Sequence, residues 1–185
     1  MLNSARITCD FLRLKAGDTA LLCMPLDYIA GKMVVVRSIE RNLRLINVKP
    51  SGHPLSDDSL HQANALHEEI IFAAMVPLQV YNSLQVPQER ERLRKIKQLI
   101  IGGGAIDDNL SEALKDFPHA VWSTYGMTET LSHIALRRLN GDSASDWYEP
   151  FDSIGVSLNA DGCLIINAPA VCPKPLVTND RAELQ

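Results

Sequence analysis

The segment STYGMTETLSH, residues 123–133, gathers chemically capable side chains directly after a short apolar run. It contains the ring of Tyr125, the flexible backbone of Gly126, the hydroxyl of Thr128 and the carboxylate of Glu129. A ring can stack on a base, a threonine can reach phosphate, and a carboxylate suits a hard divalent cation. Each residue alone is more often structural, Tyr125 as core and Glu129 as a surface acid, but together they indicate a nucleotide site.

Two other apolar runs also end in residues suited to ligand contact. The run 97–105 (KQLIIGGGA) ends in glycines, whose backbone a ligand can approach closely, and the run 19–26 (TALLCMPL) leads into Asp27 and Tyr28. In open parallel sheets, ligands bind beyond the carboxyl ends of the strands. If these runs and 119–126 are parallel neighbours, their ends meet, and the sequence predicts a nucleotide-binding crevice there.

Two familiar phosphate-binding motifs are missing from the chain. Gly102 and Gly104 are followed three residues later by Asp107 rather than by glycine, so the dinucleotide fingerprint is incomplete. The segment 31–33, Gly-Lys-Met, has no glycine five residues before it and is not a P-loop.

The segments that would position these residues alternate between strand-like and helix-like patterns. Continuous apolar runs, as in strands buried on both faces, occupy 19–26, 70–77, 97–105 and 119–126. Helical patterns occupy 29–42, 56–69, 78–84, 87–96 and 107–117, while 43–50 alternates and breaks at its proline. This order predicts an α/β fold with a mostly parallel sheet flanked by helices.

The pattern changes after about residue 140. A polar loop, LNGDSASD, precedes short β-rich runs around Asn159-Ala160-Asp161-Gly162, and an Asp-Gly pair between such runs favours a hairpin. We therefore expect two units: a parallel α/β subdomain at 1–140 and a β-rich antiparallel C-terminal appendage at 141–185.

Composition narrows the classes of partner. The net charge of −4 argues against a polyanion-binding protein, and QERERLRKIKQ interleaves acids with bases as a solvated helix face does. Cys9, Cys23, Cys163 and Cys172 lack C-x-x-C spacing, which argues against a zinc site. There is no signal-peptide pattern or membrane-length apolar run. We expect a cytoplasmic protein with small-molecule substrates, and no nucleic-acid or membrane partner.

Four motifs resemble signatures of the adenylate-forming superfamily, which joins acyl-CoA synthetases, luciferases and peptide-synthetase adenylation domains. STYGMTE resembles a signature of that superfamily, IIGGGAI its preceding strand and loop, MPLDYIAGKM its PLxHxxG segment, and LVTND its TGD motif. They follow the family's order across nearly the whole chain. Within the family, GMTETLSHIALRRLNG and PLDYIAGKM are most similar to the o-succinylbenzoate–CoA ligases of menaquinone synthesis.

The resemblance implies a role for each matching residue. Thr128 would contact the α-phosphate and Glu129 would bind Mg²⁺, as the catalytic pair. Tyr125 would lie against adenine, and Asp180 would accept hydrogen bonds from the ribose hydroxyls. The other implied nucleotide contacts are Gly103, Gly104, Ala105, Gly126 and Met127, and the implied acyl-substrate contacts are Tyr28, Gly102, Ser132 and His133.

Two positions depart from the family pattern. Tyr28 stands where many relatives have histidine. Asn179 replaces the glycine of TGD, and asparagine tolerates a left-handed backbone better than most other residues.

The activity that the resemblance implies is a two-step ligase that uses ATP, Mg²⁺ and coenzyme A as a substrate. A carboxylate attacks the α-phosphate of ATP to give an acyl-adenylate, and coenzyme A then displaces AMP. The family's phosphate loop and C-terminal domain with its catalytic lysine are not found in the chain, so a fragment that is inactive alone is expected. Self-association would cover the surface left by the missing domains.

Three alternatives remain open at this stage. The chain could be a non-catalytic module that binds AMP or ATP, or a fragment of a fatty-acyl-CoA or aryl-CoA ligase. It could also be a folded fragment that binds no ligand.

Overall fold

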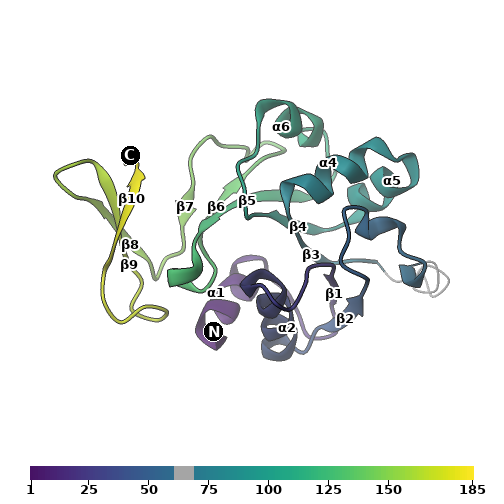
Figure 1. Cartoon of the computed structure of the whole chain (residues 1–185), viewed down its shortest axis with the longest axis horizontal. Coiled ribbons are helices and arrows are strands. Elements are labelled where there is room, and N and C mark those ends of the chain that lie inside the picture. The colour runs from purple at the N-terminus through teal and green to yellow at the C-terminus, as the bar shows by residue number, and fades with distance from the viewer. Residues whose placement is uncertain (61–68) are drawn as a thin grey trace.

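A seven-stranded sheet forms the centre of the computed structural model, which describes residues 1–60 and 69–185 (Figure 1). In spatial order the strands are β2 (Arg44–Asn47), β1 (Thr19–Leu22), β3 (Phe72–Met75), β4 (Gln98–Ile101), β5 (Ala120–Gly126), β6 (His133–Arg138) and β7 (Glu149–Pro150). The strands from β2 to β5 in this order are parallel, whereas β6 and β7 pair antiparallel. The predicted mostly parallel sheet is confirmed.

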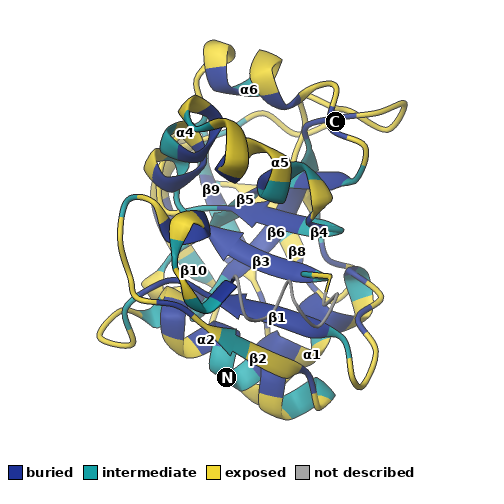
Figure 2. Ribbon diagram, turned by 90° about the vertical axis from the view of Figure 1, so that its right-hand side faces the viewer, coloured by how far each residue is buried: buried dark blue, intermediate teal, exposed yellow. Residues whose placement is uncertain are grey.

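The central strands are buried because helices cover both faces of the sheet. Every residue of β1 and β3 is buried, as their uninterrupted apolar sequences indicate (Figure 2). The helices α1 (Leu2–Phe11) and α2 (Ile29–Arg41) lie on one side of the sheet (Figure 1). On the other side lie α4 (Pro77–Gln85), α5 (Pro87–Lys95) and α6 (Asp108–Leu114).

Local sequence explains where these helices begin and end. Pro77 and Pro87 occupy first-turn positions, where the missing N–H has no intrahelical partner to lose. Asp107 caps α6, its carboxylate accepting the N–H of Leu110 at 2.8 Å. Asn42 ends α2 in the left-handed conformation. Most of the helix predicted at 56–69 lies outside the described residues, which resume at 69.

The β-rich C-terminal segment forms a separate antiparallel sheet, which lies at the left of Figure 1. Its strands are β8 (Gly155–Leu158), β9 (Cys163–Asn167) and β10 (Leu176–Arg181), in the order β10-β9-β8. In the predicted hairpin between β8 and β9, Asn159 accepts two backbone N–H groups and Gly162 has a φ of +76°.

The main sheet continues past residue 140, because β7 pairs with β6, and the separate sheet begins only at Gly155. The division into subdomains at 1–140 and 141–185 stays a prediction. Among the helices of the described chain, none has the length and apolar character to cross a bilayer.

Candidate active site

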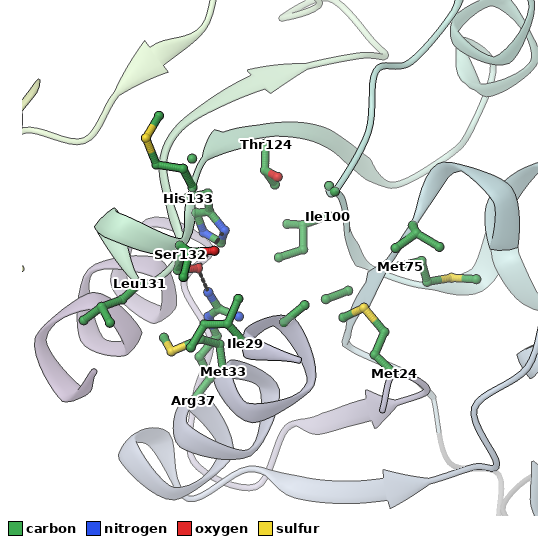
Figure 3. A pocket seen from close by; sticks show the side chains of 18 residues that line it. Met24, Ile29, Met33, Arg37, Met75, Ile100, Thr124, Leu131, Ser132 and His133 are labelled. Carbon is green, nitrogen blue, oxygen red and sulfur yellow. Dashed lines mark hydrogen bonds between the residues drawn. The ribbon is translucent and has the colours of Figure 1, made fainter. Parts of the chain in front are cut away.

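A cavity of about 260 Å³ opens at the carboxyl ends of β1, β3, β4 and β5 (Figure 3). The crossover helices change faces between β1 and β3, and open α/β sheets bind ligands at such a switch point. The cavity is lined by Met24, Ile29, Ala30, Met33, Arg37, Ala74, Met75, Val76, Ile100, Gly102, Gly103, Thr124, Gly126, Met127, Thr128, Leu131, Ser132 and His133. The ends of three strands that the sequence singled out therefore line one cavity.

Some of the predicted site residues line this cavity and others lie around it. Those that line it are Gly102, Gly103, Gly126, Met127, Thr128, Ser132 and His133. Those that do not are Tyr28, Gly104, Ala105, Tyr125, Glu129 and Asp180. Tyr28 is 67% exposed at the start of α2, where its neighbour Ile29 reaches the cavity instead. The individual roles of all these residues remain predictions.

Two of the glycines serve close packing of the backbone. A Cβ on Gly102 would overlap Oγ1 of Thr124 on the neighbouring strand. A Cβ on Gly126 would overlap the carbonyl oxygen of Ser132 and the backbone of His133. A larger residue at 126 would push β5 away from the start of β6, and one at 102 would displace the Thr124 side chain, which lines the cavity.

The loop between β5 and β6 is fixed from inside by one buried hydroxyl. Thr130 Oγ1 accepts the N–H of Met127 at 3.1 Å and donates to the carbonyl of Ser132 at 2.7 Å. Leu131 adopts a left-handed φ of 63° beside it. As a result Thr128 and Glu129 are exposed at the rim, while Ser132 lies in the cavity.

The residues predicted to contact adenine and ribose touch each other. Tyr125 donates its phenolic proton to Oδ2 of Asp180 at 2.6 Å, across 55 positions of sequence and between the two sheets. Burial, and then this hydrogen bond to Asp180, raise the pKa of Tyr125 well above its usual range. The Tyr148 ring lies 6.1 Å from the Tyr125 ring, and the Tyr148 hydroxyl is 2.6 Å from Oγ of Ser123.

Arg37 is a cavity residue that the sequence analysis does not predict. Its side chain is 2% exposed, and its Nη2 donates to Ser132 Oγ at 2.7 Å (Figure 3). Within 1–60 and 69–185, its Nε has no hydrogen-bond partner and no carboxylate pairs with it. Burial lowers the pKa of Arg37 to about 10.

One sequence signal could have revealed Arg37. It follows Ile29 and Met33 at steps of four, so that all three share the cavity face of α2. A cation placed in an apolar helical stripe, with an unsatisfied donor, needs an acceptor from elsewhere. The methionines and isoleucines of the cavity wall, by contrast, suit an apolar body.

The basic segment of α5 is explained by local structure. Arg90 binds the carbonyl of Leu84 at 2.8 Å, and Arg94 binds the carbonyl of Asp116 at 3.2 Å. Arg94 also lies over the Phe117 ring. These side chains support helix ends and helix packing. The sequence predicted a solvated helix face here; Arg90 is exposed, whereas Arg94 is partly buried.

Comparison with known families gives one match over most of the chain. The family model described as AMP-binding enzyme matches residues 1–176. The 2-succinylbenzoate–CoA ligase of Bacillus cytotoxicus is 28% identical over 123 residues, and that of a Bacillus cereus strain is 29% identical over 124 residues. Each alignment covers 66% of this chain and 24% of the relative. The chain thus spans about a quarter of the length of these curated relatives.

Solved structures share the fold. The acyl-CoA synthetase (AMP-forming)/AMP-acid ligase II-like protein of Dyadobacter fermentans is 34% identical with a TM-score of 0.89, covering 100% of this chain and 51% of that one. The o-succinylbenzoate coenzyme A synthetase of Bacillus subtilis, solved in complex with ATP and magnesium ion, is 21% identical with a TM-score of 0.72. That match covers 95% of this chain and 38% of the Bacillus subtilis chain.

Proposed function

The chain belongs to the AMP-binding enzyme family, and on this premise we propose that it forms part of an ATP-dependent acid–CoA ligase. In the first step, the acid's carboxylate oxygen attacks the α-phosphorus of ATP, and pyrophosphate leaves. In the second step, the coenzyme A thiolate attacks the acyl carbon and AMP leaves. Charge develops on phosphate oxygens in the first step, so fixed donors and a cation near them would stabilise that transition state.

The nucleotide would bind at the rim formed by β5, its following loop and β10. Tyr125 would stack on adenine, and Asp180, already 2.6 Å from the Tyr125 hydroxyl, would accept from the ribose. Thr128 and Glu129 are exposed side by side next to the cavity. Such a carboxylate suits Mg²⁺, which is usually held by one or two protein groups together with substrate phosphates. Glu129 would hold the ion, which supplies positive charge to the phosphates.

The proposed acid is o-succinylbenzoate, in the menaquinone pathway, and Arg37 is the observation that carries this choice. The guanidinium is buried at the cavity and has a free donor among the described residues. An acid with a second carboxylate would supply the missing acceptor and counter-charge. The relatives named as 2-succinylbenzoate–CoA ligases support the same choice.

The size and lining of the cavity support a compact aromatic acid. A volume of about 260 Å³ is just below the usual range for ligand pockets, roughly 300 to 1,000 Å³. Met24, Met33 and Met75 give it adaptable, polarizable walls suited to a ring. A long fatty-acyl chain would need more room than this cavity offers.

Calorimetric titration of Arg37→Met against the wild type tests the proposed acid. The matched ligand is β-benzoylpropionate, which differs from o-succinylbenzoate only in lacking the ring carboxylate. We expect the wild type to prefer o-succinylbenzoate and Arg37→Met to lose about tenfold or more of that preference. A charge-assisted hydrogen bond contributes about 1.5–3 kcal/mol, and about 1.4 kcal/mol is tenfold.

The other outcomes identify the alternatives. Equal affinity for the two acids would remove o-succinylbenzoate and favour an aryl-CoA or fatty-acyl-CoA ligase. Binding of AMP or ATP without either acid would favour a non-catalytic nucleotide module. A folded chain that binds neither the acids nor the nucleotides would refute both the proposed acid site and the proposed nucleotide site.

A further inference from the structure

A line of buried polar side chains runs from α1 to the guanidinium of Arg37. Thr8 Oγ1 lies 3.1 Å from the carbonyl oxygen of Ser4 and 3.0 Å from Nε2 of His133. On the other side of the ring, Nδ1 of His133 lies 3.3 Å from Oγ of Ser132. Ser132 Oγ in turn accepts from Arg37 Nη2 at 2.7 Å. Ser4, Thr8, His133 and Arg37 are all at most 9% exposed.

The number of protons available on each group decides which atom donates in each of these hydrogen bonds. The imidazole is neutral, because burial and the nearby charge of Arg37 hold the pKa of His133 well below its usual range. Arg37 can only donate, so Ser132 Oγ must use a lone pair toward it. The Ser132 proton is then free to point at Nδ1, and His133 carries its own proton on Nε2. That proton goes to Thr8 Oγ1, and the Thr8 proton goes to the Ser4 carbonyl.

The opposite arrangement leaves the hydroxyl proton of the half-buried Ser132 without a protein acceptor. If His133 carried its proton on Nδ1, Ser132 Oγ would accept from both His133 and Arg37. The Ser132 hydroxyl proton would then have no acceptor among the contacts of the described residues. With Nε2 protonated, both ring nitrogens, the hydroxyls of Thr8 and Ser132 and the Ser4 carbonyl all have protein partners, so this arrangement is favoured.

We propose that Thr8 and His133 are positioning residues for the anion-binding end of the cavity. By fixing the imidazole tautomer they hold the Ser132 hydroxyl with its lone pair toward Arg37, and Ser132 holds the guanidinium against the cavity. Neither Thr8 nor the His133–Thr8 contact reaches the ligand directly. This inference rests on the proposed function, since it assigns the recognised group as the second carboxylate of the acid.

The first test reads the tautomer without any ligand. Nitrogen NMR of the ¹⁵N-histidine-labelled chain at neutral pH identifies the ring nitrogen of His133 that carries the proton, by its one-bond coupling. We expect Nε2 in the wild type and in Thr8→Ser, which keeps the hydroxyl. A proton on Nδ1 of wild-type His133 would overturn the proposal, whether or not any variant folds.

The second test measures discrimination between two acids. Thr8→Val keeps the side-chain shape but removes the acceptor for the His133 Nε2 proton. We expect Thr8→Val to lose about tenfold in affinity for o-succinylbenzoate and little for β-benzoylpropionate, as expected when one charge-assisted contact is misaligned. Thr8→Ser should restore the preference, which a merely structural role for the methyl group would not predict.

The results separate this inference from the proposed function. If the wild type prefers o-succinylbenzoate and Thr8→Val keeps that preference, only the positioning role is overturned. If the wild type binds both acids equally, the proposed acid is wrong and the positioning role falls with it.

Discussion

Replacing Tyr125 by phenylalanine separates two contributions of this side chain. Tyr125→Phe keeps the ring that would stack on adenine but removes the proton that Asp180 accepts at 2.6 Å. Hydrogen bonds to charged groups contribute about 1.5–3 kcal/mol when buried. Because Asp180 is exposed and can be rehydrated, we expect the free energy of unfolding to fall by only about 1 kcal/mol.

The sign of the pH dependence follows from the raised pKa of Tyr125. A phenol whose pKa is higher in the folded than in the unfolded state stabilises the fold fully below the unfolded value, near pH 10. That stabilisation is lost as the pH rises above this value through the higher folded pKa. The difference in unfolding free energy between wild type and Tyr125→Phe should therefore shrink only at alkaline pH.

Urea unfolding across this pH range, combined with AMP titration, is the assay. Tyr125→Phe should bind AMP within a few-fold of wild type, whereas Tyr125→Ala should lose about 1–2 kcal/mol because base–aromatic stacking is absent. A variant Tyr125→Phe as defective as Tyr125→Ala would mean that the hydroxyl, and not the ring, makes the nucleotide contact. Equal stability of wild type and Tyr125→Phe at neutral pH would refute the bond between the sheets.

Two further changes have defined outcomes. Asn140→Ala should reduce the free energy of unfolding, measured in urea, by at least about 2 kcal/mol. The reason is that the buried amide of Asn140 accepts from Val121 at 2.9 Å and donates to the carbonyls of Phe117 and His119. A loss below about half that value would mean that these hydrogen bonds do not stabilise the fold as argued. Glu129→Gln should weaken ATP binding in the presence of Mg²⁺ by roughly tenfold, since a hard cation prefers charged oxygen ligands. It should leave AMP binding without metal unchanged. Calorimetry with and without Mg²⁺ tests this, and an equal loss of affinity in both conditions would mean that Glu129 has only a structural role.

The parallel part of the sheet could be predicted because burial of its strands on both faces determines their sequence pattern. Strands buried on both faces read as continuous apolar runs, and those runs contain β1, β3, β4 and β5. The hairpin after β8 was equally clear, since its Asp-Gly pair meets a backbone requirement at Gly162.

The features that the sequence did not predict involve polar residues in buried positions. The buried face of α1 includes Ser4 and Thr8 beside Ala5 and Cys9, and polar residues are normally placed on the surface, so no helix was predicted there. Arg37 was missed for the same reason, because a charged residue in a helical pattern is normally placed on the surface. The Tyr125–Asp180 bond joins residues 55 positions apart, and no local pattern contains that information.

The position of α1 in the chain also affects how the protein is made. Some of its partners are close in sequence, since Arg6 pairs with Glu40 of α2 at 2.9 Å. Others lie far downstream: Phe11 packs edge-on against Trp122 and Phe151, and Thr8 contacts His133 across 125 positions. At the usual synthesis rate of about 5–20 residues per second, those distant partners leave the ribosome roughly 6–28 s after α1 does. During that interval α1 exposes the side that later packs against Trp122, His133 and Phe151. This helix therefore completes its native contacts late, and nascent chains of this protein are expected to depend on chaperones at this helix.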